Sequence, residues 1–427
     1  MPNLEYGHNG PQILNRFNST IRDLNKKILT AFNEIGIKKV VDISTENGLG
    51  SGFYSATAAN GERQSTATTY LNTIKDRVNL KIIKHSLVTK VLVDDTSKTA
   101  YGVEVDRNGT TVRFYASNEV ILSAGTINTP QLLMLSGIGP KDHLIANNIT
   151  CLVDSPGVGK NLHDHCVVPI TIYGNEPGPT NNADRQFDVI RYLYDRKGYL
   201  QMGGSDTTAL FSTDSNSNYP LFQTFLALSN KNSSSATSWA SSVARYHQTV
   251  VDSITEQNAN QSLYNFFFIL LHPKSRGNIS LNSADPKDYP LIYYSNFEDS
   301  RDLQSAVEGI KILTKIVDTK YFQSINGHVG RMKWPACDRF DVDSDEYWKC
   351  ICINMVVTIY HPVGTAKMGV DPKTSVVNSR LKVHGVQRLR VVDASVMPTT
   401  TSGNTNGPVI MIGERASDLI KQDNRNK

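Results

Sequence analysis

The chain has 427 residues and a formal charge of +4, from 44 basic and 40 acidic side chains. These charges form no basic block and no Lys/Arg cluster among aromatic residues, so the composition argues against a nucleic-acid partner and gives no signal for a membrane surface. No apolar run approaches the roughly 18 residues that span a bilayer, and the first residues do not match a secretory signal. The length suits two domains, or one large domain, with a sizeable core.

The N-terminal part predicts helices on either side of a glycine-rich turn. Apolar residues recur at helical spacing from Ile21 to Ile35, and Gly36 is placed to end that helix. The stretch Asn47 to Phe53, NGLGSGF, predicts a turn near a ligand. Its glycines do not follow the GxGxxG spacing, so it resembles a phosphate loop only loosely. A second helix is expected to begin after Gly61.

The pattern then becomes α/β. Two short β runs are expected at Leu80 to Lys84 and at Val88 to Val93. A hairpin follows, because two further β runs, Ala100 to Val105 and Thr111 to Ala116, flank the turn sequence Asn108-Gly109.

The next stretch predicts a strand, a turn and a helix in direct succession. The apolar strand Val120 to Leu122 leads into the small residues Ser123-Ala124-Gly125, and the helix that follows carries Pro130 near its start. This order suits an anion or a dinucleotide at the carboxyl end of a sheet.

The long middle part of the chain alternates amphipathic helices and strands and predicts a separate, mixed domain. Before it, PGVGKNLHDH carries His163 and His165; a metal site would need a third ligand, which no spacing suggests, and no metal site is predicted. Cys337 and Cys350 flank an acidic and aromatic loop. A disulfide in an oxidising compartment and two reduced cysteines in the cytosol are both compatible with this spacing.

The stretch Tyr360 to Pro408 carries two residues with complementary chemistry. His361 lies in YHPVGTAKMG and Asn404 in SGNTNGP, and the β-like run Leu389 to Val392, ending in Asp393, separates these two turn sequences. A proton-accepting imidazole and a neutral amide suit the removal of a proton from an alcohol while its oxygen is held. The alternative is that His361 is a buried structural histidine and GNTNGP a loop before a helix.

Ordered motifs resemble the glucose-methanol-choline (GMC) flavin oxidoreductases. GTINTPQLLMLSGIG, from Gly125 to Gly139, resembles the second signature of that family, and PGVGKNLHDH resembles the segment after it. HPKSRGNISLNSADPKDYPLI resembles the start of the C-terminal half, and YHPVGTAKMG with DASVMPTTTSGNTNGP resembles the active-site end. The C-terminal motifs and DEYWKC are most similar to the insect branch, which includes FAD-quinone glucose dehydrogenases and ecdysteroid oxidases.

The resemblance implies FAD as the cofactor and an alcohol as the substrate. His361 lies where the catalytic base of the family lies, and Asn404 lies at the partner position, which is His or Asn in different members. The base would take the hydroxyl proton as hydride leaves for flavin N5, and the amide would donate a hydrogen bond to the alkoxide. The resemblance also assigns cofactor contacts: Val88 beside the adenine, Asp393 and Ala394 at the ribityl-phosphate region, and Thr405 and Asn406 at the pyrimidine end of the isoalloxazine.

The expected fold is α/β, and α+β in the substrate part: a partial doubly wound FAD-binding sheet with an inserted mixed substrate domain. The expected divisions are residues 1–46 as an N-terminal piece on the substrate side, 47–168 as the first piece of the FAD-binding domain, 169–355 as the substrate-binding domain, and 356–427 as the C-terminal piece of the FAD-binding domain with the active site.

This sequence departs from the family pattern at its beginning. The family starts with a βαβ unit that carries GxGxxG and, about 20 residues later, an acidic residue, and neither is found here. The chain is therefore expected to be a fragment of an FAD-dependent oxidoreductase that acts on a sugar, a steroid or another alcohol and uses a quinone or oxygen as acceptor. A truncated, non-catalytic GMC-like binding protein is the alternative. By resemblance, the full-length protein is expected to be secreted.

Overall fold

The structure is a computed structural model that describes residues 7–16, 21–44, 48–176, 182–201, 206–214 and 216–425. Asn47, the first residue of the expected glycine-rich turn, lies outside these ranges. The chain divides into two compact units: unit 1 is Met1–Leu80, Cys166–Leu271 and Ser300–Val357, and unit 2 is Lys81–His165, His272–Asp299 and Thr358–Lys427. Residues 47–80 thus group with unit 1 and residues 272–299 with unit 2, whereas the sequence analysis placed them with 81–168 and 169–355.

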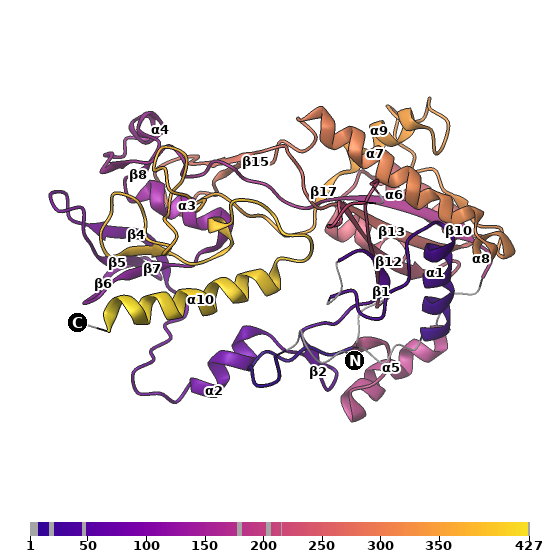
Figure 1. The fold of residues 1–427 in the computed structure, drawn as a ribbon, viewed down its shortest axis with the longest axis horizontal. Coiled ribbons are helices and arrows are strands. Elements are labelled where there is room, and N and C mark those ends of the chain that lie inside the picture. Colours follow the sequence, from indigo (N-terminus) through magenta and orange to yellow (C-terminus); the bar gives the residue numbers. More distant parts are fainter. Residues whose placement is uncertain are drawn as a thin grey trace. The chain divides into compact units, whose positions relative to one another are not determined.

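Unit 1 is organised around an antiparallel sheet whose neighbouring strands come from distant parts of the sequence (Figure 1). The strands, in their order across the sheet, are β1 (Gly50–Phe53), β11 (Thr207–Phe211), β12 (Phe222–Ser229), β13 (Ser262–Leu270), β10 (Cys166–Gly174) and β16 (His328–Val329). Every residue of β10 is buried, as in a strand that is covered on both faces.

Helices of unit 1 pack against this sheet: α1 contacts β1 and β11, α7 contacts β13, and α9 contacts β10. The helices are α1 (Arg22–Glu34), α2 (Asn72–Ile74), α5 (Asn182–Asp195), α6 (Gln248–Asn258), α7 (Ser300–Thr314), α8 (Lys320–Ser324) and α9 (Asp345–Met355). Shorter elements are β2 (Ala58–Ala59), β3 (Glu62–Arg63), η1 (Ala67–Leu71), η2 (Tyr199–Gln201), η3 (Trp239–Val243) and η4 (Lys315–Asp318). α1 confirms the predicted helix; Ile28, Leu29 and Phe32 are buried, and Gly36 follows its end with φ +92°.

The glycine-rich stretch Gly50–Phe53 forms strand β1, so the prediction of a turn at these residues was wrong. Its backbone pairs with β11 from Gly50↔Leu210 to Phe53↔Thr207. A Cβ atom on Gly50 would lie 2.7 Å from the carbonyl oxygen of Lys38. The glycine therefore permits a close approach of two backbone segments within unit 1.

Unit 2 contains a three-stranded antiparallel sheet, β4-β5-β6, and a parallel pair, β7-β18. Its strands are β4 (Leu87–Val93), β5 (Ala100–Arg107), β6 (Thr110–Tyr115), β7 (Val120–Leu122), β8 (Ile138–Gly139), β9 (Val153–Asp154), β14 (Asn278–Ser280), β15 (Leu291–Tyr293) and β18 (Leu389–Val391). Its helices are α3 (Gly125–Leu135), α4 (Lys141–Ala146), η5 (Ala394–Val396) and α10 (Asn406–Asn424). The short β17 (Val357–Thr358) lies where the chain passes from unit 1 to unit 2.

The hairpin prediction in unit 2 is confirmed, and one strand prediction beside it is wrong. Asn108 and Gly109 join β5 to β6 with φ of 52° and 84°, the left-handed pair that a tight hairpin requires. Leu80 to Lys84, in contrast, is not a strand. Its apolar residues resemble a β run, but residues 80–84 have no regular secondary structure and pair with no strand that the structure describes.

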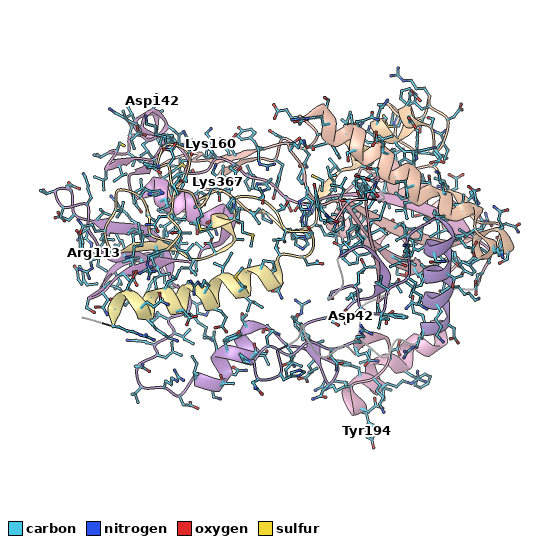
Figure 2. The ribbon with its side chains drawn as sticks, viewed as in Figure 1. Asp42, Arg113, Asp142, Lys160, Tyr194 and Lys367 are labelled. Atoms are coloured by element: carbon cyan, nitrogen blue, oxygen red, sulfur yellow. A yellow bond between two sulfur atoms is a disulfide. The ribbon has the colours of Figure 1, made fainter. Side chains whose placement is uncertain are left out.

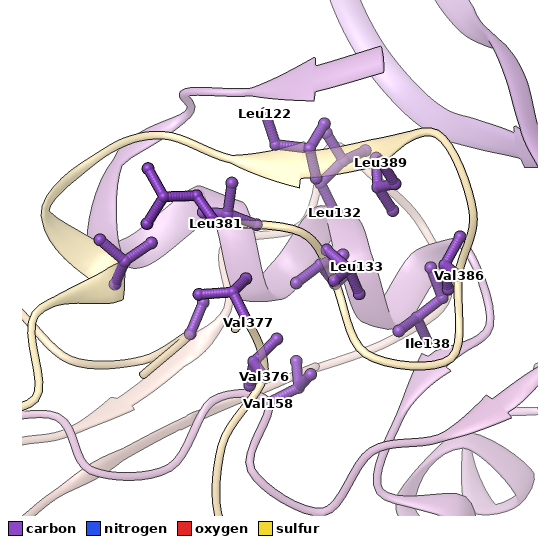
Figure 3. Packing of buried hydrophobic residues seen from close by; sticks show 14 of the residues in the cluster. Leu122, Leu132, Leu133, Ile138, Val158, Val376, Val377, Leu381, Val386 and Leu389 are labelled. Carbon is purple, nitrogen blue, oxygen red and sulfur yellow. The ribbon is translucent and has the colours of Figure 1, made fainter. Parts of the chain in front are cut away.

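The core of unit 2 joins β7 and β18 to α3 (Figure 3). Leu122 and Leu389 from the two strands pack with Leu132 and Leu133 of α3 and with Val377 from the C-terminal segment. The two strands run parallel, with Val391 opposite Leu122. Because parallel strands end at the same edge, residues that follow β7 and residues that follow β18 are brought side by side.

A disulfide joins Cys337 to Cys350 in unit 1, so these two cysteines are bonded, as in the first of the two alternatives that the sequence left open. The bond closes a short loop, with a sequence separation of 13. We expect the double variant Cys337→Ser/Cys350→Ser to lose about 3 kcal/mol of unfolding free energy, the chain-entropy value for a loop of this size. Urea unfolding of the oxidised chain measures this, with Cys151→Ser, which removes a half-buried free thiol, as control. Equal midpoints for parent and double variant would contradict it.

Helix α5 of unit 1 exposes large apolar side chains. Tyr194 is 92% exposed and projects outward (Figure 2), and Leu193 is 70% exposed. Neither this helix nor any other within the described ranges is long and apolar enough to cross a membrane.

Candidate active site

An antiparallel bridge in unit 2 brings two histidine-bearing segments together. His163 and Val363 exchange both backbone hydrogen bonds, at 3.2 and 2.9 Å. In an antiparallel pair, each step forward on one segment meets a step back on the other. This register places His165 opposite His361, two positions from the bridge on each side.

Asp164 holds the backbone of the turn that carries His361. Its carboxylate accepts hydrogen bonds from the His361 N–H at 2.9 Å and from the Thr358 hydroxyl. Between them, Tyr360 adopts a positive φ of 63°, which turns the chain sharply. Burial raises the pKa of Asp164 to about 6, against the opposing effect of these donors. The carboxyl group is the acceptor in both bonds.

His361 and Asn404 lie in contact, as neighbours across the predicted site. The Asn404 Nδ2 and His361 Nε2 atoms are 3.2 Å apart. Burial lowers the pKa of His361 to about 4, so its ring is neutral at pH 7 and able to accept a proton. Asn404 is exposed and lies two residues before α10 begins, which leaves this end of the pair accessible.

His165 is the functional candidate that the sequence analysis did not assign to the site. Its ring is fully buried; Nδ1 lies 2.9 Å from His361 Nδ1, and Nε2 lies 3.0 Å from the carbonyl oxygen of Thr401. A further histidine, His272, contacts the Ser402 hydroxyl at 3.0 Å. The sequence HDH by itself resembles only a weak metal motif, and His165 is identified by the antiparallel register of its segment with that of His361.

Asp393 clamps the end of β18 to the start of α3. Its Oδ2 accepts hydrogen bonds from Gly125 N–H at 2.9 Å and Thr129 Oγ1 at 2.6 Å, and its Oδ1 accepts from the backbone and hydroxyl of Ser395. The first N–H of α3, where an external anion was expected, is therefore occupied by this carboxylate. Asp393 is 6% exposed, so its buried carboxylate stabilises the turn after β18 through these hydrogen bonds.

The other predicted cofactor residues lie on three elements of unit 2. Ala394 follows Asp393 as the first residue of η5, and its carbonyl accepts the Gly364 N–H at 3.3 Å. Thr405 and Asn406 directly follow Asn404; Thr405 is buried and Asn406 begins α10. Val88 is half-buried on β4, in a different sheet. The structure thus groups Thr405 and Asn406 with His361 and Asn404.

The start of α10 has the donors that a flavin edge needs. Within the described part of the chain, the backbone N–H groups of Asn406 and Gly407 have no protein acceptor, and no side chain caps this helix. A Cβ on Gly407 would meet nothing within 4 Å, so the approach is open. Two free N–H groups at the positive end of a 19-residue helix fit an acceptor-rich ring edge.

A metal centre is not assembled by the residues that the structure describes, since no group of three or more His, Cys, Asp or Glu side chains is placed to hold an ion. His163, the other half of the suspected pair, is 2% exposed, and its Nδ1 lies 2.7 Å from the Asn161 carbonyl oxygen. The ring of His163 therefore forms a local hydrogen bond within its own segment.

Two family models match the chain over most of its length. The N-terminal model of the GMC oxidoreductases matches residues 13–167, and the C-terminal model matches residues 273–413. The chain belongs to the GMC oxidoreductase family. The resemblance noted in the sequence is thereby confirmed.

Relatives support this assignment. The chain is 39% identical to an ecdysone oxidase of Bombyx mori over 93% of its own length and 58% of that protein. It is 35% identical to an alcohol dehydrogenase [acceptor] of Pseudomonas putida over 94% of its own length and 69% of that protein. This GMC chain therefore spans less than two thirds of the length of the insect relative.

The fold also matches a solved structure. A formate oxidase of Aspergillus oryzae superposes with a TM-score of 0.81 and 24% identity, covering 98% of this chain and 74% of the other. At this identity the match establishes the fold alone. The mixed α/β architecture expected from the sequence is confirmed.

Proposed function

We propose that this GMC chain carries the proton-handling end of an FAD-dependent oxidoreductase that acts on CH–OH groups. The observation that carries the proposal is the contact between His361 Nε2 and the Asn404 amide at 3.2 Å, at the open start of α10. The names of the two relatives, ecdysone oxidase and alcohol dehydrogenase, are consistent with an alcohol as substrate.

His361 is proposed as the base. Its lowered pKa keeps the ring neutral at physiological pH, and the unprotonated nitrogen of a neutral imidazole accepts the proton of a substrate hydroxyl. Asn404 cannot ionise, so its amide N–H is available to donate to the substrate oxygen as negative charge develops there. Asp164 accepts a hydrogen bond from the backbone N–H of His361 and thereby fixes the main chain that carries the ring.

When bound, FAD supplies the hydride acceptor. We propose that Thr405 and Asn406 hold the pyrimidine end of its ring through backbone N–H groups, and that Val88 contacts the adenine. Asp393 and Ala394 are proposed for the ribityl-phosphate region. For Asp393 this role acts through the turn, because its carboxylate already accepts four hydrogen bonds from the protein.

The substrate class and acceptor are also part of the proposal. A sugar, a steroid or another alcohol is proposed as substrate, and a quinone or oxygen as acceptor; the relatives include an oxidase and an acceptor-dependent dehydrogenase. An oxidising, extracellular location is proposed for the full-length protein. The disulfide between Cys337 and Cys350 supports that location, since such bonds are rare in the cytosol.

The test uses the chain itself, in two steps. The purified chain is incubated with FAD, freed of excess, and its flavin absorbance is recorded; candidate alcohols are then added without oxygen. We expect bound flavin and loss of its absorbance with at least one alcohol. A chain that retains no flavin would contradict the proposal and favour the non-catalytic binding protein. Bound flavin that no alcohol reduces would contradict the substrate class.

A further inference from the structure

We infer that His165 is a positioning residue that sets which ring nitrogen of His361 carries the proton. The inference deepens the proposed function and rests on it for its catalytic meaning. It starts from a chain of three hydrogen bonds in unit 2, from the Thr401 carbonyl through His165 and His361 to the Asn404 amide.

The direction of this chain is set at its first bond. A carbonyl oxygen accepts hydrogen bonds and cannot donate them, so His165 Nε2, at 3.0 Å from the Thr401 oxygen, must carry a hydrogen. A neutral imidazole has one N–H and one lone pair. His165 Nδ1 is therefore the acceptor nitrogen.

The second hydrogen bond then determines which ring nitrogen of His361 carries the proton. The two Nδ1 atoms are 2.9 Å apart, and since the His165 atom accepts, the His361 atom donates. The His361 proton then resides on Nδ1, and its Nε2 keeps a lone pair. That lone pair faces the Asn404 Nδ2 at 3.2 Å, which donates to it.

The geometry favours this single arrangement. The two rings meet edge to face, with centroids 5.0 Å apart and an angle of 86° between their planes. This series of hydrogen bonds begins at the Thr401 carbonyl and ends at the Asn404 amide. One short loop therefore provides both the acceptor at one end and the donor at the other. His165 is fully buried, so it acts on the reaction only through His361.

The consequence concerns the proposed base. A histidine with its proton on Nε2 would present an N–H to the open side and could not take a proton there. By holding the proton on Nδ1, His165 keeps the reactive nitrogen of His361, Nε2, unprotonated. Asp164 fixes the backbone of the same residue, so adjacent residues control the position and the tautomer of one ring.

The first test reads the tautomers directly in the unmodified chain. Two-bond proton–nitrogen correlation spectra, recorded on chain labelled at its histidine ring nitrogens and assigned with His361→Gln and His165→Asn, distinguish the protonated nitrogen of each ring. We expect the proton of His165 on Nε2 and that of His361 on Nδ1. The proton of His361 on Nε2 would overturn the inference without any need for a folded variant at position 165.

The second test compares two substitutions of His165. His165→Asn keeps an acceptor oxygen near the position of Nδ1, whereas His165→Leu has none. We expect the leucine variant to shift His361 towards the Nε2–H form and the asparagine variant to retain the parent form; His328→Asn, an exposed histidine of unit 1, is the control. An unchanged His361 spectrum in His165→Leu would also overturn the inference.

Alcohol-dependent flavin reduction gives an independent readout. We expect His165→Leu to lose roughly 10- to 100-fold in rate, the range typical for partners that orient a functional histidine, and His165→Asn to lose less. If no alcohol reduces the flavin in the parent while the spectra follow the prediction, the proposed function fails and the positioning role of His165 stands. Equal losses in both variants would contradict a role through the tautomer.

Discussion

Alanine in place of His361 is expected to slow flavin reduction by alcohol about 10² to 10⁴-fold, the usual contribution of a positioned base. The physical reason is the loss of the one neutral imidazole nitrogen that faces Asn404 at the open start of α10. Stopped-flow mixing of the FAD-loaded chain with substrate measures the rate constant. His8→Ala, at an exposed position of unit 1, is the matched control, and equal rates for parent and His361→Ala would reject the base assignment.

The pH dependence of the parent supplies a second readout of the same residue. Burial lowers the pKa of His361 to about 4, and the imidazole accepts a proton only in its neutral form, which predominates above that pKa. Protonation of His361 should therefore leave the reduction rate unaffected through the neutral range and lower it only as the pH approaches about 4. Such an acid limb should be absent from the residual rate of His361→Ala.

Replacement of Arg390 by methionine is expected to lower the unfolding free energy by about 3 to 5 kcal/mol, the cost of removing one partner from a buried ion pair. The Arg390 side chain is 2% exposed, and its guanidinium contacts Glu119 at 2.7 Å and Asp423 at 2.6 Å. It thereby ties β7, β18 and the end of α10 together. Urea unfolding of the chain without flavin measures the loss.

Glu119 bears most of this cost. Asp423 keeps Arg380 at 2.6 Å and Lys382 at 2.7 Å when Arg390 is removed, whereas within the described residues the other oxygen of Glu119, Oε1, is buried without a hydrogen-bond partner. The double variant Arg390→Met/Glu119→Met should therefore recover part of the stability. A double variant no more stable than Arg390→Met would contradict this account.

An exposed ion pair in the same unit provides the control. Arg113 (Figure 2) contacts Glu104 at 3.1 Å, with 59% of its side chain exposed, and Arg113→Met should lower the unfolding free energy by less than about 1 kcal/mol.

The pKa of Asp423 is lowered by hydrogen bonds from Lys382, Arg390 and Arg380. Because a depressed carboxyl pKa stabilises the fold above the pKa of the unfolded state, this contribution is present at neutral pH and is lost in acid.

Elements with local geometric causes were predictable. Asn108-Gly109 specified a hairpin because two left-handed residues in succession suit a tight turn, and the apolar spacing from Ile21 to Ile35 specified α1 because a helix repeats within a few residues. The run Leu80 to Lys84 had the same local signal as a strand. It failed because a strand needs a partner, and no local pattern states whether one is present.

His361 and Asn404 were named from their turn sequences and from a family resemblance; their types suit proton transfer, but taken alone they also suit a structural histidine and a loop before a helix. The function of their neighbours could not be read in the same way. His165 meets His361 across 196 positions and Asp393 meets Thr129 across 264, and such pairs depend on the register of a backbone bridge and on the parallel pairing of β7 with β18.

The residues themselves thus determined the family and the chemistry available at the site, because side-chain types and short motifs are local properties. Tertiary structure alone decided that Asp393 is saturated by protein donors and that Gly50–Phe53 is a strand. It also decided that the buried ring of His165 contacts the ring of His361. In each case the reason is the same: hydrogen-bond direction and burial arise between segments that only the folded chain brings within contact.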